Sequence, residues 1–233
     1  MPIVRTAALR VLPLLLVAAA APLGAQTVVD QGAFQVTVEG RAAGREEFAI
    51  RQSGTGSGSE VTANGRVEVS LPGGTLELTP RLRARGLDAS PVSYQVDVGG
   101  DSPRRILGQV GAGRFSARIV TGSGEQLREY VASDRAVILD DGVAHHYYFL
   151  AQRLNSGRVP VIVPRENRQV LATVTSRGEE QATIAGTPVR LYHLVVQIPG
   201  SSERHVWVDA LNRVIRVRIP ATGYEAVRTE VPR

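Results

Sequence analysis

Apolar and polar residues alternate over most of this chain, which is the pattern of β-strands that bury one face and expose the other. In the first such stretch Phe34, Val36 and Val38 share one parity, with polar residues between them. Short turns rich in glycine separate several of the segments, and returns this short predict antiparallel meander connectivity. The further segments expected to be strands are residues 61–71, 76–85, 92–98, 104–110, 114–120, 126–132, 159–163, 169–176, 181–185, 189–198, 204–209, 214–219 and 224–230.

The clearest hairpin joins residues 61–71 to residues 76–85 through the turn Pro72-Gly73-Gly74. Its apolar parity predicts the buried positions, as it does in the first strand. Its polar parity carries the strongest basic row of the chain. The expected buried residues include Val36, Val38, Val67, Val69, Leu76 and Leu78, and the basic row is Arg81, Arg83 and Arg85.

One segment departs from the period of two. After Asp140-Asp141-Gly142, the residues Val143, Tyr147, Leu150, Ala151 and Leu154 recur at helical spacing, and Asn155-Ser156-Gly157 supplies a stop. We therefore predict a helix over residues 143–154. Because twist accumulates across many strands, the expected fold is all-β with one principal helix, an antiparallel open or closed β-barrel.

An outer-membrane barrel would show the same alternating segments. Aromatic residues make up only 5% of the chain, which leaves little for two interfacial girdles, and arginine rows would face lipid or lumen. A barrel outside the membrane is therefore the favoured interpretation, and an outer-membrane or extracellular protein is the alternative.

The first 25 residues have the composition of a secretory signal peptide. Arg5 and Arg10 flank the start of an apolar run, Val11 to Ala21, which is too short to span a bilayer. We expect cleavage before Gln26, a single domain over residues 26–233, and a periplasmic location.

Composition excludes several classes of chemistry. The chain has no cysteine, so it can form neither a disulfide nor a thiolate site. Of the 27 basic residues, Arg5 and Arg10 belong to the predicted signal peptide, which leaves 25 against 22 acidic residues. This mild excess is spread along the strands, so nucleic acid is not an expected partner.

The sequence shows no strong catalytic motif, since both a Gly-x-Ser-x-Gly elbow and a His-Glu-x-x-His motif are absent. His145 and His146 are adjacent on the predicted helix, where neighbouring side chains point about 100° apart. They are poorly placed to hold one metal ion, and we expect them on a polar shoulder of the helix. No cofactor or metal is expected.

A second histidine pair lies on neighbouring strands. If Ile198 pairs with Arg204, then His193 opposes Asp209 on the face that also carries Trp207. A His193 and Asp209 pair could orient a general base, but no nucleophile accompanies it. A cross-strand polar pair is the simpler interpretation.

The C-terminal stretch Val206-Trp207-Val208-Asp209, a turn through Asn212-Arg213 and the returning segment Val214 to Ile219 resemble a hairpin of the LolA/LolB-like periplasmic lipoprotein-carrier superfamily. The resemblance implies an open β-barrel whose apolar inside holds acyl chains under a helical lid. It carries over no catalytic residue. The absence of cysteine excludes a lipid-anchored version.

The sequence therefore favours an exported, non-catalytic protein that binds a lipidic or other apolar ligand in a barrel cavity, with lipid or lipoprotein acyl chains as possible partners and at most a peripheral membrane association. The alternatives are a structural or interaction protein of the envelope, whose helix fills the barrel as core, and a hydrolase that uses His193 and Asp209. The candidate ligand contacts are Arg81, Arg83, Arg85, Tyr147, Tyr148, Phe149 and Trp207.

Overall fold

The computed structural model describes residues 26–71, 73–133, 135–153 and 157–233. The predicted signal peptide therefore lies outside the described residues. The same holds for Pro72 of the predicted hairpin turn and for residues 154–156 at the predicted helix end.

The described residues form one sheet of 15 strands, in which almost every strand pairs with its neighbour in sequence. The exceptional pairing is between β1 and β15, which joins the two halves of the chain, and β8 and β9 are the two edges. The strands are β1 (Thr27–Val38), β2 (Arg41–Ser53), β3 (Glu60–Leu71), β4 (Gly74–Arg85), β5 (Ser90–Val98), β6 (Arg104–Gly111), β7 (Arg114–Thr121), β8 (Gly124–Val131), β9 (Val137–Ile138), β10 (Arg158–Val163), β11 (Arg168–Ile184), β12 (Thr187–Gln197), β13 (Arg204–Val208), β14 (Val214–Ile219) and β15 (Tyr224–Arg228).

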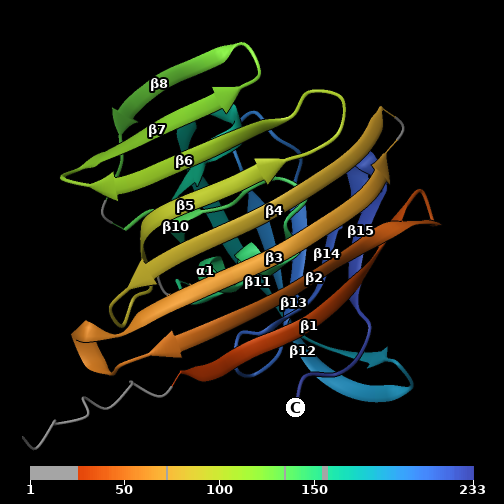
Figure 1. Cartoon of the computed structure of the whole chain (residues 1–233). Helices are drawn as coiled ribbons and strands as arrows, with labels where there is room; N and C mark the ends of the chain where they lie inside the picture. The colour runs from red at the N-terminus through yellow and green to blue at the C-terminus, as the bar shows by residue number, and fades with distance from the viewer. Residues whose placement is uncertain (1–25, 72, 134, 154–156) are drawn as a thin grey trace, which may run out of the picture.

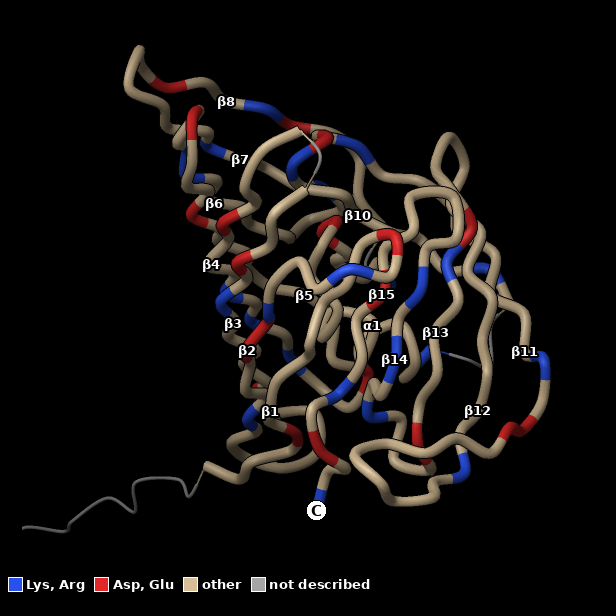
Figure 2. The backbone as a smooth tube through the Cα atoms, turned by 90° about the vertical axis from the view of Figure 1, so that its right-hand side faces the viewer, with Lys and Arg blue, Asp and Glu red and all other residues tan. Residues whose placement is uncertain are grey.

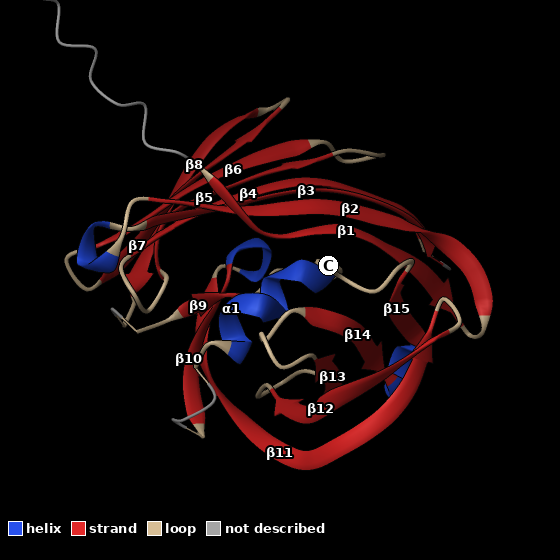
Figure 3. Cartoon of the chain, turned by 90° about the horizontal axis from the view of Figure 1, so that it is seen from below, coloured by secondary structure: helices blue, strands red, loops and turns tan. Residues whose placement is uncertain are grey.

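The sheet curls on itself, so that β1 to β8 lie across from β10 to β15 (Figures 1 and 3). Close to the edge strands, two hydrogen bonds join the two halves of the sheet. The Ser133 amide donates to Gln169 Oε1 at 2.8 Å, and the Tyr130 hydroxyl donates to the Arg168 carbonyl at 3.4 Å. The prediction of an all-β, barrel-like fold with a helix is confirmed. All described pairings are antiparallel apart from that of β9 with β10.

Most predicted strands lie within one to three residues of the observed ones, and the hairpin of β3 with β4 is confirmed. Residues 169–176 and 181–185 belong to one strand, β11, because a bulge between Ser176 and Gly178 lets it continue. The alternation did not predict β2 or β9. Of the expected buried residues, Val36, Val67, Val69 and Leu78 are buried, whereas Val38 and Leu76 are half-buried.

The helix is much shorter than predicted. The α-helix α1 spans only Tyr147–Ala151 and is preceded by a 3-10 turn, η2 (Ala144–His146). The described residues also form the 3-10 turns η1 (Gly56–Gly58), η4 (Pro164–Glu166) and η5 (Pro220–Thr222). No helix in the described ranges is long and apolar enough to cross a membrane.

Residues 143–151 lie inside the curled sheet, between its two halves, and we call them the plug (Figure 3). All of them except Tyr148 are buried. The expectation that His145 and His146 form a polar shoulder is wrong, because both are completely buried. The segment therefore fills the barrel as part of its core.

Glu46 of β2 fixes the plug in place. Its carboxylate is completely buried and accepts hydrogen bonds from the backbone amides of Ala144 at 2.7 Å and His145 at 2.9 Å. A third contact joins it to His145 Nδ1 at 2.6 Å. A buried carboxylate needs hydrogen-bond donors, and the plug has backbone amides without partners in a sheet or a long helix. The hydrogen bonds between them therefore satisfy both groups.

The plug also needs space that a side chain on β3 would take. A Cβ on Gly65 would lie 2.6 Å from His145 Cε1 and 3.3 Å from Pro80 Cγ. Replacing Gly65 by alanine is expected to lower the free energy of unfolding by about 1–3 kcal/mol, because the stacked rings of His145 and Phe48 must shift. Urea denaturation measures the loss.

Gly111 provides the matched control for this substitution. It also lies in a strand, but an added Cβ there meets nothing within 4 Å. The Gly111→Ala variant is expected to change stability by less than about 1 kcal/mol, and in the stabilising direction if at all. Equal effects at the two positions would contradict close packing of the plug against β3.

Candidate functional site

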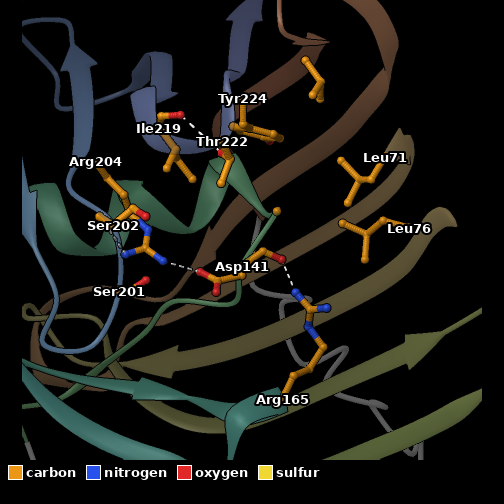
Figure 4. Close-up of a pocket in the computed structure, with 12 residues that line it drawn as sticks. Leu71, Leu76, Asp141, Arg165, Ser201, Ser202, Arg204, Ile219, Thr222 and Tyr224 are labelled. Carbon is orange, nitrogen blue, oxygen red and sulfur yellow. Dashed lines mark hydrogen bonds and ion pairs between the residues drawn. The ribbon is translucent and has the colours of Figure 1, made fainter. Parts of the chain in front are cut away.

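A cavity of about 530 Å³ opens at one end of the barrel, and we call it the mouth pocket (Figure 4). Ends of the β1–β2, β3–β4, β12–β13 and β14–β15 hairpins surround it, together with the segment that leads into the plug. Its volume lies within the range of roughly 300–1,000 Å³ that is typical of small-molecule sites.

One wall of the mouth pocket is apolar. Tyr224 pairs with Val38 on one side and with Ile219 on the other, so these three side chains share one face. Leu71 and Leu76 continue the wall on the neighbouring hairpin, as Figure 4 shows. Leu71 is 37% exposed, so part of this aliphatic surface is open to water. Covering it with a ligand would be favourable.

The floor of the pocket depends on Gly142. This residue has a φ of +79°, and a Cβ there would lie 2.6 Å from Leu76 Cδ2. Only glycine fits both conditions without strain. The turn that leads into the plug thereby packs directly beneath the aliphatic wall.

Asp141, Arg165 and Arg204 line the opposite side of the pocket, and the completely buried Asp140 pairs with Arg165. Asp140 has a completely buried side chain and accepts from Arg165 Nε at 2.6 Å and from the Tyr94 hydroxyl at 2.5 Å. Burial raises the pKa of Asp140, although Arg165 acts to lower it. Burial and the neighbouring Asp140 charge raise the pKa of Tyr94 far above its usual range, so Tyr94 remains a donor.

Asp141 lies between the two arginines (Figure 4). Its backbone carbonyl accepts from Arg165 Nη2, and its carboxylate Oδ1 accepts from Arg204 Nη2 at 2.6 Å. Arg204 Nη1 also donates to the Ser202 carbonyl at 3.2 Å. Both guanidiniums are therefore held in place before any ligand arrives.

These contacts do not use all the donors. Arg165 Nη1 donates to no residue in the described part of the chain. Arg204 Nε also has no partner there, but it is buried and so is not open to a ligand. Arginine can only donate, so the unused capacity favours a ligand with acceptor oxygens. Ser201, Ser202 and Thr222 complete the polar side.

The structure places the predicted arginine row elsewhere. Arg81, Arg83 and Arg85 are exposed on the outer side of β4, and Arg83 forms an ion pair with Glu60 of β3 at 2.9 Å. None of the three lines the mouth pocket. Figure 2 shows basic and acidic residues dispersed along the strands rather than gathered on one side.

The predicted aromatic contacts divide between two regions. Tyr147 and Phe149 are buried in the plug, and Tyr148 is half-buried beside them. Trp207 points to the opposite side of β13 from Val206 and packs in a separate, smaller cluster. That cluster comprises Ile184, Leu191, Trp207 and Ile215.

The expected opposition of His193 and Asp209 is wrong. Arg204 pairs with Val196 instead of Ile198, because the pairing of β12 with β13 stops two residues earlier than predicted. A shift of two residues keeps the face but changes every partner, so His193 lies opposite Trp207. Asp209 instead accepts from Arg213 Nε at 2.7 Å.

His193 belongs to a network of polar and stacking side-chain contacts on the outer face of the sheet. Its Nδ1 contacts Glu180 at 2.7 Å and its Nε2 contacts His205 Nδ1 at 2.9 Å, while its ring stacks on Trp207 with centroids 4.4 Å apart. Glu180 also accepts from Trp207 Nε1. Within the described residues, no group of three or more histidine, aspartate or glutamate side chains is placed to hold a metal ion.

The sequence pattern gave no candidate site at Glu46, Arg165 or Arg204, and it used Asp140-Asp141-Gly142 only to mark where the predicted helix begins. Glu46 could have been noticed from the sequence. It lies two residues before Phe48 and four before Ile50, on the face of the strand where an apolar residue is expected. Arg204 begins a strand and Arg165 lies in a turn, so neither departs from an ordinary surface pattern.

His146 makes stability depend on pH. Burial lowers the pKa of His146 well below its usual range, and the charges of His145 and Arg165 act in the same direction. The unfolded chain therefore gains a proton near pH 6.5 that the folded chain does not bind, and stability falls as the pH drops below that value. Between pH 7 and pH 5 this residue is expected to lower the free energy of unfolding by at most about 2 kcal/mol, the limit for a folded state that binds no proton there.

The His146→Asn variant tests this prediction. In the wild type the Asp140 amide donates to His146 Nδ1 at 3.3 Å. An asparagine at this position offers an acceptor oxygen to the same amide, but its side chain does not titrate. Urea denaturation at both pH values, followed by the fluorescence of the single tryptophan, should show a smaller loss in the variant. His205→Asn, at a partly exposed position, should keep the wild-type loss. Identical losses in wild type and His146→Asn would contradict the prediction.

No family model matches this chain, and no curated protein matches it. A similar solved structure is that of a beta-barrel-like protein of the domain of unknown function DUF1849 from Brucella abortus, with a TM-score of 0.52 and 10% identity. The match covers 84% of this chain and 94% of that one. It supports the barrel-like fold, and it does not confirm the resemblance to the LolA/LolB-like superfamily.

Proposed function

We propose that this chain is an exported, non-catalytic envelope protein that binds an amphipathic ligand in the mouth pocket. The observation that carries the proposal is the pocket itself. It combines an aliphatic wall, which includes the partly exposed Leu71, with arginine donors on the opposite side. Ligand sites of this kind use the apolar wall for affinity and a few polar groups for orientation.

The site differs from the barrel cavity that the sequence suggested. The plug fills the interior, so a ligand would lie at the mouth, with its apolar part against Leu71 and Leu76. Each buried methylene group contributes about 0.8 kcal/mol, so a short acyl chain would provide useful affinity. The export part of the proposal rests on the signal-like composition of residues 1–25, and a carrier role like that of the LolA/LolB-like proteins remains its most specific form.

A neutral fluorescent probe, N-phenyl-1-naphthylamine, tests the proposal on delipidated protein. The wild type is expected to enhance its emission in a saturable titration. The Leu71→Asp variant should bind about tenfold more weakly or worse, because a carboxylate in the wall must lose water when the probe binds. Leu71 is already partly exposed, so the variant should fold.

Leu127 of β8 provides the matched control, since it is an exposed leucine, 78% accessible, outside the mouth pocket. Leu127→Asp should bind the probe as the wild type does. Absence of saturable binding by the wild type, or equal weakening in the two variants, would overturn the proposal.

A structural or interaction role is the second candidate, and the edge strand β8 favours it. Leu127 and Val131 lie on one side of this strand, and both are more than 70% exposed. A partner at this edge should hold the protein in the envelope fraction of the native cell. In that case the Leu127→Glu and Val131→Glu double variant would leave this fraction, whereas Leu71→Asp would remain in it.

A further inference from the structure

The two arginines make the polar side of the mouth pocket a site for negatively charged oxygen. Arg204 is 4% exposed and Arg165 is 15% exposed at the side chain, so both charges lie largely out of water. An arginine keeps its proton in any such environment. Each guanidinium also presents a planar set of donors that matches a carboxylate or a phosphate.

The aspartates do not cancel these charges equally. Asp141 is 47% exposed, and water screens an exposed charge far more strongly than a buried one. Asp140 is completely buried, and both of its oxygens are already occupied, by Tyr94 and by Arg165. Asp140 therefore has no free oxygen for a ligand at the mouth, whereas Arg165 still has a donor to offer.

The unused donors show where the charged group would bind. Arg165 uses Nε and Nη2 to hold Asp140 and the Asp141 carbonyl, which leaves Nη1 without a partner in the described chain. Figure 4 shows this guanidinium beside the Asp141 backbone, with Leu76 above it. A ligand oxygen that accepts from Arg165 Nη1 would thus lie at the border between the polar side and the aliphatic wall of the pocket.

We infer that the mouth pocket selects single-chain amphiphiles with an anionic oxygen head group, a carboxylate or a phosphate monoester, bound to Arg165 and oriented by Arg204. The inference rests on the proposed function, because it names the class of ligand for the same pocket. The apolar tail of the ligand lies along Leu71 and Leu76, and its head group lies at the polar side of the pocket. Asp141 is the one carboxylate among the described residues that line the pocket, and it already pairs with Arg204, so a cationic head group is rejected.

Isothermal titration of delipidated protein with four ligands of equal chain length tests the inference: laurate, dodecyl phosphate, dodecanol and dodecyltrimethylammonium, all below their micelle concentrations. We expect laurate or dodecyl phosphate to bind about tenfold more tightly than dodecanol or better, and the cation to bind most weakly. The better of the two anions distinguishes a fatty acid from a phosphate ester.

Arginine variants identify the contact. Because Arg165→Met alone would leave Asp140 buried and unpaired, it is combined with Asp140→Asn and compared with Asp140→Asn as its reference. The added Arg165→Met should reduce laurate affinity about tenfold or more and leave dodecanol affinity unchanged. Arg204→Met, whose partner Asp141 is half exposed, should weaken laurate in the same selective way. Arg81→Met, at an exposed arginine outside the pocket, should have no effect.

The outcomes separate the two proposals. If all four ligands bind equally, or if Arg165→Met weakens dodecanol as much as laurate, the inference is wrong and the proposed function stands. If none of the four binds, the proposed function is wrong and the inference falls with it.

Discussion

Replacing Glu46 by alanine is expected to lower the free energy of unfolding by about 3–5 kcal/mol, among the largest effects of any single substitution in this protein. The carboxylate is completely buried and holds the amides of Ala144 and His145 as well as the ring of His145. Without it, these donors stay buried with no acceptor, and each unpaired amide costs about 1–3 kcal/mol. Urea denaturation measures the total.

Hydrogen exchange separates loosening of the plug from a general loss of stability. The Ala144 and His145 amides should exchange much faster in Glu46→Ala, by local opening, than amides in the β3–β4 hairpin. Glu46→Gln should be intermediate, since its oxygen still accepts one hydrogen bond while its amide group opposes the remaining donors.

Glu47 gives the matched control. It follows Glu46 on β2 but points outward, and it forms an ion pair with Arg45 in which both side chains are more than half exposed. Glu47→Ala should change stability by less than about 1 kcal/mol. If Glu46→Ala behaved in the same way, the plug would not depend on this carboxylate.

Glu46 also explains why β2 could not be predicted. The strand carries Phe48 and Ile50 on its buried face, and a charged residue at the next buried position interrupts the alternation that identifies strands. The meander from β3 to β8 shows the opposite case. There β3, β4, β6 and β7 alternate buried and more exposed residues over most of their length and short turns follow them, so local sequence was enough to place these strands to within about two residues.

The plug and the mouth pocket depend on contacts between distant parts of the chain, which no local pattern contains. The helical spacing from Val143 to Leu154 correctly predicted a helix, but η2 replaces its first turn, where Glu46 satisfies the backbone amides. His145 and His146 are polar, so a surface position was expected. Their burial requires Glu46 from β2 and the space beside Gly65 on β3.

The register of β12 with β13 shows a different limit. The face of His193 was predicted correctly, because side chains alternate with a period of two. Its partner was not, because the partner depends on how many residues the turn contains. The mouth pocket has the same dependence, since it is assembled from hairpin ends whose positions only the closed sheet determines.

Replacing Arg228 by methionine is expected to lower the free energy of unfolding by about 3–5 kcal/mol. Arg228 lies on β15, where the last strand of the chain pairs with the first, and its side chain is completely buried. It donates to Asp30 Oδ2 at 2.5 Å, to the Val214 carbonyl at 2.8 Å and to the Gln31 carbonyl at 2.9 Å. The guanidinium thereby ties β1, β14 and β15 together at the joint of the sheet.

The neighbourhood of Arg228 is shaped to accept it. A Cβ on Gly32, which has a φ of +149°, would lie 2.6 Å from Arg228 Nη1. The guanidinium carbon lies 5.1 Å from the centre of the Phe34 ring and 4.5 Å from that of Phe48, within cation–π distance. Methionine can fill part of this volume, so the loss should come mainly from the unpaired Asp30.

Changing Asp30 and the pH should therefore restore part of the stability. Burial already raises the pKa of Asp30 against the opposing effect of Arg228, so removing Arg228 raises it further. The folded Arg228→Met variant then binds a proton more tightly than the unfolded chain, and its stability deficit shrinks as the pH falls from 7 toward 5. The Asp30→Asn and Arg228→Met double variant should lose less free energy of unfolding than Arg228→Met alone.

Arg218→Met, at an exposed position on β14, is the control and should change the free energy of unfolding by less than about 1 kcal/mol. A deficit in Arg228→Met that is independent of pH and of Asp30→Asn would show that packing, rather than the buried charge pair, holds the two ends of the chain together.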